Sequence, residues 1–320
     1  MNLNVRIIIF MSVLFLCAGV LYRENLGSHA QAAEFDGWGY TVNAGVAIDV
    51  YPISEENKIG TVIVPASLNE FKVEEIKMNA FSDCDKITRI ELPATVMEIG
   101  SSAFKNCKNL NSVYIADNSI LEYIHSYAFS NCKSLTAINL PDSLLWIDNY
   151  AFEYCMELTY IKIAASVEYI GWNAFRCCEK LKEVDIPYDS ILTHINTYAF
   201  DGCIALTTID IPNSVYYMGS GVFIRCRELT KLKLPTSLET VNPALFAQCS
   251  GLTSMVIPEG VDMIGDSAFT ACTGITSITI PESVHLIEKM AFYECSNLKS
   301  IVIPNAVNDI GERAFLIAQN

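Results

Sequence analysis

Phenylalanine recurs along this chain at a nearly constant interval, and no other sequence feature constrains the fold as strongly. Eleven phenylalanines are separated by ten intervals of about 23 residues, two of which are longer by a dipeptide. The positions are Phe81, Phe104, Phe129, Phe152, Phe175, Phe200, Phe223, Phe246, Phe269, Phe292 and Phe315. A repeat period of about 20–50 residues is typical of proteins built from stacked coils. We therefore expect one solenoid domain rather than the two domains that 320 residues would otherwise allow.

Other positions of the repeat keep the same period. A cysteine stands three residues after each of the first ten phenylalanines, and the full unit reads A-F-x-x-C-x-x-L-x-x-I-x-[IL]-P-x-x-V-x-x-I-G-x-x. The I-x-[IL] segment alternates like a strand, and the proline after it ends the strand because it cannot donate a ladder hydrogen bond. V-x-x-I is a second short extended segment. The A-F-x-x-C-x-x-L segment has the i, i+3 spacing of a short helical turn.

A single coil of about 23 residues offers too few apolar side chains to offset the entropy of ordering its backbone, so the coils must stack. Stacking places each strand beside the equivalent strand of the next coil, about 4.8 Å away. We therefore expect a right-handed α/β solenoid with a parallel sheet of stacked coils, over residues 61–320. The two 25-residue coils carry their extra residues directly after the strand, where the insertions should bulge outward.

The repeat resembles the BspA-type leucine-rich-repeat family. The resemblance covers about 260 residues from Thr61 onward, with Val62-Ile63-Val64-Pro65 in the opening coil and ten copies of the unit after it. Residues 33–60 would then be an N-terminal cap. The resemblance implies a secreted or surface-displayed protein that acts in adhesion to host matrix proteins or to other cells. That family has no fixed binding motif, so no binding residue is transferred.

Residues 1–32 are typical of a secretory signal peptide. Arg6 precedes an uncharged apolar run of 16 residues, and Ala30-Gln31-Ala32 offers a small-x-small cleavage site. An uncleaved signal anchor is the alternative, although the run is shorter than the roughly 20 residues of a membrane span. We expect a secreted or cell-surface protein with no membrane span after cleavage. Without these residues the chain keeps 19 Lys and Arg against 35 Asp and Glu, so nucleic acid is not an expected partner.

The cysteines and the acidic residues do not indicate catalysis. Ten cysteines share one repeat position, so their side chains should point the same way into the core as free thiols, and 23-residue spacing does not suit a metal site. Cys177 lies outside this set and is the one expected to be reactive. Asp185 and Asp210 stand one coil apart like a glycosidase pair, but no motif of a nucleophile, phosphate loop or metal ligand accompanies them. We predict no enzymatic activity and no cofactor.

Residues that vary between coils are the candidates for binding, because the repeated residues make the fold. The position before the isoleucine of V-x-x-I carries a ring in five consecutive coils. Four of these rings, Tyr123, Trp146, Tyr169 and Tyr217, form the predicted binding stripe, and His194 completes the run. Eleven of the 15 tyrosines fall between residues 114 and 217, although the repeat does not require them there. Tyrosine and tryptophan are enriched in binding hot spots. The alternative is that these rings only stabilise one another.

A second candidate surface lies on the predicted sheet face. The outward strand positions there combine charge and aromatic rings, at Tyr114, Tyr160, Lys162, Asp185 and Asp210. The sequence thus favours a non-catalytic binding protein whose partner is an extracellular protein. A glycan-binding module that uses the aromatic stripe is one alternative, and a structural scaffold element is another.

Overall fold

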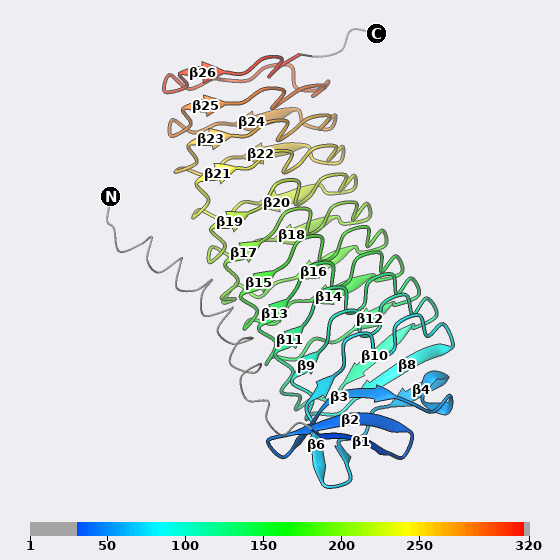
Figure 1. Ribbon diagram of the computed structural model, residues 1–320. Helices are drawn as coiled ribbons and strands as arrows, with labels where there is room; N and C mark the ends of the chain where they lie inside the picture. Colours follow the sequence, from blue (N-terminus) through cyan, green and yellow to red (C-terminus); the bar gives the residue numbers. More distant parts are fainter. Residues whose placement is uncertain (1–30, 317–320) are drawn as a thin grey trace.

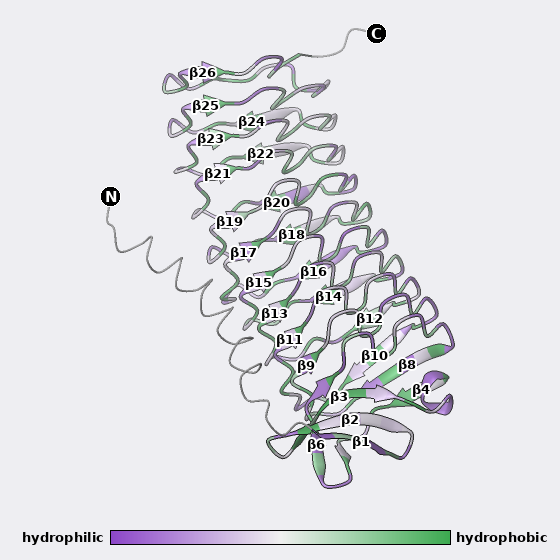
Figure 2. Cartoon of the chain, in the orientation of Figure 1, coloured by the Kyte–Doolittle hydropathy of each residue, from purple (hydrophilic) through white to green (hydrophobic). Residues whose placement is uncertain are grey.

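The computed structural model describes residues 31–316 as one stack of coils (Figure 1). Each coil contributes a short strand from its V-x-x-I segment and, in most coils, a second strand from its I-x-I segment. Equivalent strands of successive coils pair in parallel, so the strands form two rows along the stack. This arrangement confirms the predicted parallel-sheet solenoid. Figure 2 shows apolar and polar stretches intermixed along the stack.

The V-x-x-I row pairs two-residue strands in strict register, each one coil from the next. Its members are β7 (Glu75–Ile76), β9 (Glu98–Ile99), β11 (Tyr123–Ile124), β13 (Trp146–Ile147), β15 (Tyr169–Ile170), β17 (His194–Ile195) and β19 (Tyr217–Met218). A separate sheet continues the row with β21 (Thr240–Val241), β23 (Met263–Ile264), β25 (Leu286–Ile287) and β26 (Asp309–Ile310). In each strand up to β25, the second residue is buried and the first points outward.

The I-x-I row consists of three sheets. The first contains β4 (Gly60–Ile63), β8 (Ile87–Leu92), β10 (Ser112–Ile115) and β12 (Ala137–Ile138). The second contains β14 (Tyr160–Lys162), β16 (Glu183–Asp185), β18 (Thr208–Asp210) and β20 (Lys231–Lys233). The third contains only β22 (Ser254–Val256) and β24 (Ser277–Thr279).

An antiparallel meander covers the N-terminal end of the stack. It consists of β1 (Gln31–Phe35), β2 (Trp38–Asn43) and β3 (Val46–Pro52), and β3 also pairs with β7 and β6 (Phe71–Val73). The hairpin partner of β6 is β5 (Ser67–Leu68). Trp38 is buried with its ring edge on Phe81, at 6.1 Å between centroids. Residues 1–30 of the predicted signal peptide lie outside the described residues, and its last two residues, Gln31 and Ala32, begin β1.

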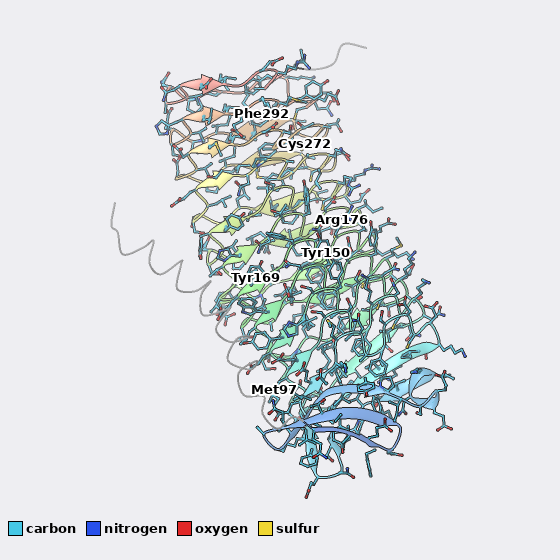
Figure 3. The ribbon with its side chains drawn as sticks, in the orientation of Figure 1. Met97, Tyr150, Tyr169, Arg176, Cys272 and Phe292 are labelled. Carbon is cyan, nitrogen blue, oxygen red and sulfur yellow. The ribbon has the colours of Figure 1, made fainter. Side chains whose placement is uncertain are left out.

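The phenylalanines form one continuous column through the core. From Phe81 to Phe315 neighbouring rings stack nearly parallel in all but one pair, with centroids 5.0–5.8 Å apart. Figure 3 labels Phe292 near the C-terminal end of this column and Cys272 one coil away. Stacked rings are favourable beyond the apolar area that they bury, so the column links the coils on the side away from the strands.

The segment around each phenylalanine is not the short helical turn that its spacing predicts. The described residues two before and two after each phenylalanine adopt positive φ values between 54° and 73°, which a right-handed helix cannot contain. Backbone amides there donate alternately within the coil and to the next coil: Cys107 donates to Phe104 O at 3.2 Å, and Phe104 donates to Ala128 O at 2.7 Å. Within residues 31–316 the one helix is the 3₁₀ turn η1 (Glu56–Lys58).

The repeated cysteines are free thiols, as expected. Nine of the ten are buried, and each of these nine donates its S–H to the main-chain oxygen of the phenylalanine in the preceding coil. The Sγ of Cys107, for example, lies 3.0 Å from Phe81 O. Burial raises the pKa of the Cys107 thiol to about 12. Cys84 and Cys177 are half-buried.

Candidate binding surface

The predicted aromatic stripe exists as a continuous line of rings along the V-x-x-I row. Its members are the outward residues of β11, β13, β15, β17 and β19, and parallel register places each beside the next. The ring of Trp146 stacks on Tyr169 with centroids 5.3 Å apart, and Tyr123 lies 6.4 Å from Trp146. His194 continues the line at 6.2 Å from Tyr169 and 5.5 Å from Tyr217. Figure 3 labels Tyr169 within this row.

The rings of the stripe are partly buried rather than fully exposed. Tyr123, Trp146, Tyr169 and His194 are half-buried against one another, whereas Tyr217 is 40% exposed and the adjacent Tyr216 is 51% exposed. Burial raises the pKa of the Tyr169 hydroxyl and lowers the pKa of the His194 imidazole. The stripe therefore presents aromatic rings and uncharged polar groups along one line of paired strands.

An ion pair flanks the N-terminal end of the stripe. The His125 ring stacks on Tyr123 with centroids 6.0 Å apart, and its Nε2 lies 3.1 Å from Glu98 Oε2. Burial lowers the pKa of His125, but the hydrogen bond with Glu98 together with the negative charges of Glu98, Asp148 and Glu75 raises the pKa overall. Beyond the stripe, the same column continues as Thr240, Met263 and Leu286, which carry no ring.

A second row of rings lies on the turn between the stripe and the phenylalanine column. Tyr127 and Tyr150 stack with centroids 4.5 Å apart, and the Lys105 ammonium sits 4.6 Å above the Tyr127 ring. Tyr198 and Trp172 on the same turn are 40% and 53% exposed. Trp172 and Tyr216 are surface rings that the repeat columns did not single out. Only the general aromatic enrichment of these coils indicated them.

The sheet-face candidates separate into two groups. Tyr160, Lys162 and Asp185 lie together on β14 and β16, where the Tyr160 hydroxyl donates to Asp185 Oδ2 at 3.1 Å. Asp210 lies on β18 of the same sheet, opposite Lys233. Tyr114 belongs to a different sheet, on β10, and the Arg89 guanidinium lies 5.9 Å from its ring centroid. The structure therefore does not unite Tyr114 with the other four residues, nor the sheet face with the aromatic stripe.

Buried charges on the phenylalanine side form a network that the sequence did not reveal. Arg176 bridges Glu153 Oε1 at 3.0 Å and Asp201 Oδ2 at 3.2 Å, and Arg225 adds a second contact to Asp201 at 2.7 Å. Asp201 and Glu153 are 4% and 8% exposed, so both carboxylates depend on these partners. Figure 3 labels Arg176 on this side of the stack. The network links four successive coils.

Neither a metal-binding cluster nor a membrane-spanning helix occurs within residues 31–316. This part of the chain holds no group of three His, Cys, Asp or Glu side chains arranged to bind a metal ion. It also contains no helix long and apolar enough to cross a bilayer.

Stacked coils with two rows of parallel strands around an apolar core define a leucine-rich-repeat solenoid. The profile of the BspA type leucine rich repeat region matches residues 74–192 and 193–320, with six copies. The chain therefore belongs to the BspA-type leucine-rich-repeat family.

Several solved structures are similar to the chain. The pneumococcal vaccine antigen PcpA is 21% identical with a TM-score of 0.51, over 88% of this chain and 78% of that chain. A leucine rich cell surface protein from Faecalibacterium prausnitzii is 23% identical with a TM-score of 0.48, over 86% of this chain and 95% of that one. A leucine-rich repeat protein from Bacteroides ovatus is 25% identical with a TM-score of 0.47, over 90% of each chain. No curated protein matches the sequence.

Proposed function

We propose that this protein is an exported, non-catalytic binding protein that holds an extracellular protein along its aromatic stripe. The observation that carries the proposal is the unbroken line of contacting rings from Tyr123 to Tyr217. The repeat does not need these rings, because the same column holds Thr240, Met263 and Leu286 in later coils. Rings that are already packed lose little conformational freedom on binding, so they provide affinity at low entropic cost.

Family membership supports a role at the cell surface, in adhesion to host matrix or to another cell. A net charge of −15 also supports a basic rather than an acidic partner surface. Tyr160, Lys162, Asp185 and Asp210 on the sheet face supply a second, more polar surface that a large partner would reach.

The test compares two matched double variants against a panel of purified matrix proteins. Trp146→Ala with Tyr169→Ala removes the centre of the stripe, whereas Met263→Ala with Leu286→Ala truncates the same column in the C-terminal coils. We expect the stripe variant to lose about 2 kcal/mol of binding free energy, or roughly 30-fold in affinity. The control variant should bind like the unaltered protein. An equal loss of affinity in both variants, or no loss in either variant, would contradict the proposal.

Glycan binding is the second candidate, because exposed rings such as Trp172 and Tyr217 can stack on sugar faces. A glycan array with the same two double variants distinguishes it: stripe-dependent signal on the array with none on the matrix panel would assign the stripe to a glycan. Silence in both screens would favour a scaffold role.

Export itself has a direct test. Mass spectrometry of the mature protein should give an N-terminus at Ala33, after cleavage at Ala32. An intact N-terminus in the membrane fraction would instead indicate a signal anchor.

A further inference from the structure

Both strand rows stop at the same place in the stack. Within the described residues, β19 is not paired with β21, and β20 is not paired with β22. The I-x-I row has one other interruption, between β12 and β14, but there the V-x-x-I row continues through β11, β13 and β15. Figure 1 shows the coils of β19 and β20 standing further from those of β21 and β22 than other neighbours do. We call this boundary the junction.

Side-chain links along the I-x-I row fail at the junction as well. The hydroxyls of Thr207, Thr230 and Thr276 each donate to the main-chain oxygen of the equivalent residue one coil earlier, at 3.2 Å. Among the described residues, Thr253 is the member of this column just past the junction, and its hydroxyl makes no such bond to Thr230.

At the junction the V-x-x-I row keeps only side-chain bonds, of a kind that other coils make in addition to their strand ladder. The Ser237 hydroxyl donates to Val215 O, and the Asn242 amide donates to Met218 O. The backbone amide of Thr236 donates to the side-chain oxygen of Asn213. These bonds tether the two coils while the backbone of β21 stays apart from that of β19.

Packing is also looser on the I-x-I face. The inward side chain of Leu232 on β20 is only half-buried, whereas its equivalents Ile209 and Met255 are 1% and 3% exposed. A cleft of about 440 Å³ opens beside Leu232, with Lys233 and Val256 among its lining residues. At the junction this face therefore lacks both strand pairing and close packing.

The phenylalanine side remains intact across the same boundary. Gly221, Phe223 and Arg225 donate backbone hydrogen bonds of 2.9–3.0 Å to the next coil. The Cys249 thiol donates to Phe223 O at 3.0 Å. The Phe223 and Phe246 rings still stack, although their 5.8 Å separation is at the upper end of the column.

We infer that the solenoid consists of two rigid stacks joined by a hinge on its phenylalanine side, with the strand faces opening and closing at the junction. A row of backbone connections along one edge defines an axis, and on the other faces only a few side-chain tethers oppose rotation about it. Tyr217, the last ring of the stripe, lies on the final coil of the first stack. Rotation therefore changes the angle at which the C-terminal stack meets a partner held on the stripe.

Pulsed electron paramagnetic resonance on nitroxide pairs tests the hinge. Glu183→Cys with Ser300→Cys spans five coils across the junction, and Ser112→Cys with Lys231→Cys spans five coils within the first stack. Both pairs should be about 24 Å apart for coils stacked at about 4.8 Å. The control pair crosses the interruption between β12 and β14, where only one row is broken. Both pairs are introduced into a protein that also carries Cys84→Ser and Cys177→Ser, so that the two half-buried native thiols cannot be labelled. Mass spectrometry checks that each protein carries two labels.

We expect the distance distribution of the junction pair to be at least twice as wide as that of the control pair. Equal widths would overturn the hinge. Hydrogen exchange on the unaltered protein gives an independent measurement that needs no substitution. Amides of residues 231–241 should exchange at least tenfold faster than those of residues 160–170, and equal protection of the two segments would also overturn the inference.

Discussion

At the scale of the residue, the buried thiols are the most informative side chains. Each is enclosed in the core and donates to a main-chain carbonyl, an interaction that a purely apolar side chain at this position could not make. Burial raises the pKa of the Cys295 thiol to about 11 and holds that of the fully enclosed Cys132 and Cys203 thiols well above the ordinary value. The folded state therefore disfavours the thiolate form.

Because the folded state disfavours ionisation of the thiols, the free energy of unfolding should fall as the pH rises into the alkaline range. Because the folded pKa values are raised, the stability that the thiols contribute is fully present below the unfolded pKa near 9 and is lost as pH rises toward 11–12. Each thiol should contribute a slope of about 1.4 kcal/mol per pH unit in that window. Cys132→Ala with Cys203→Ala should flatten the dependence by about 3 kcal/mol per pH unit. Denaturant midpoints of the double variant and of the unaltered protein, measured between pH 8 and 10.5, check this prediction. Identical slopes of stability against pH in the two proteins would argue against it.

Thiol labelling gives a second prediction at this scale. In the native protein a small maleimide should react at Cys84 and Cys177, which are half-buried, and not at the nine enclosed thiols. The sequence alone indicated only Cys177, because Cys84 shares the repeated position and its looser environment in the first coil is not visible in the repeat. The denatured mature chain should label at all eleven cysteines, and native disulfides within the repeated set would refute the assignment.

The left-handed residues beside each phenylalanine offer a stabilising substitution. Ala271 has φ near 56°, and Gly202 occupies the equivalent position in an earlier coil. Ala271→Gly should therefore raise the free energy of unfolding by about 0.5–1 kcal/mol, since an L residue in this region costs more than the extra entropy of glycine. Ala268→Gly, at a buried position without positive φ, should be destabilising instead. Urea denaturation of both variants distinguishes the two effects.

At the scale of the element, the strand positions were readable from the sequence because two-residue and three-residue strands follow the repeat without drift. Tyr123, Trp146 and Tyr169 were therefore placed correctly beside one another. The turns were not predictable in the same way. Positive φ recurs at positions that hold Asn106 and Asn131 in some coils but Tyr127 and Met290 in others. The repeat therefore showed no consistent turn residue, and its i, i+3 spacing favoured a helix. The interactions of neighbouring coils determine those turns.

The stripe and the core should differ in what they contribute to stability. Trp146→Ala with Tyr169→Ala removes rings that are half-buried against each other, and each aromatic pair contributes about 0.5–1.5 kcal/mol beyond its buried area. Ile161 on β14 is fully enclosed, so Ile161→Ala should cost about 2–5 kcal/mol. Thermal and urea unfolding should rank the double variant as the milder change. The reverse order would mean that the stripe is primarily structural.

At the scale of the whole molecule, the junction shows what a repeat pattern cannot indicate. Leu232 and Met255 replace the consensus isoleucine with other apolar residues, and the 23-residue period continues from Phe223 to Phe246. The periodicity therefore predicts an even stack. Whether two strand rows continue depends on backbone hydrogen bonds between coils, which the identity of the repeated residues does not specify.

The N-terminal meander should govern the stability of the first coils. Trp38 covers the N-terminal end of the phenylalanine column. Trp38→Ala should therefore lower the free energy of unfolding by about 3–5 kcal/mol and should expose the Phe81 ring. Phe35→Ala on the same hairpin is a suitable control, because Phe35 is 46% exposed and should be nearly neutral. Hydrogen exchange should show early loss of protection in residues 76–99 of the Trp38 variant. Uniform loss along the whole chain would show that the stack unfolds as one unit.

The thiol column also sets a kinetic requirement on a chain that is exported as proposed. A thiol is shielded only after its own coil has stacked between its neighbours, so until then eleven cysteines meet the oxidants of the extracellular space. Disulfides form in seconds to hours, whereas folds dominated by contacts near in sequence assemble much faster. Rapid stacking therefore decides the oxidation state of the protein, and a chain delayed in folding would be cross-linked before it could recover.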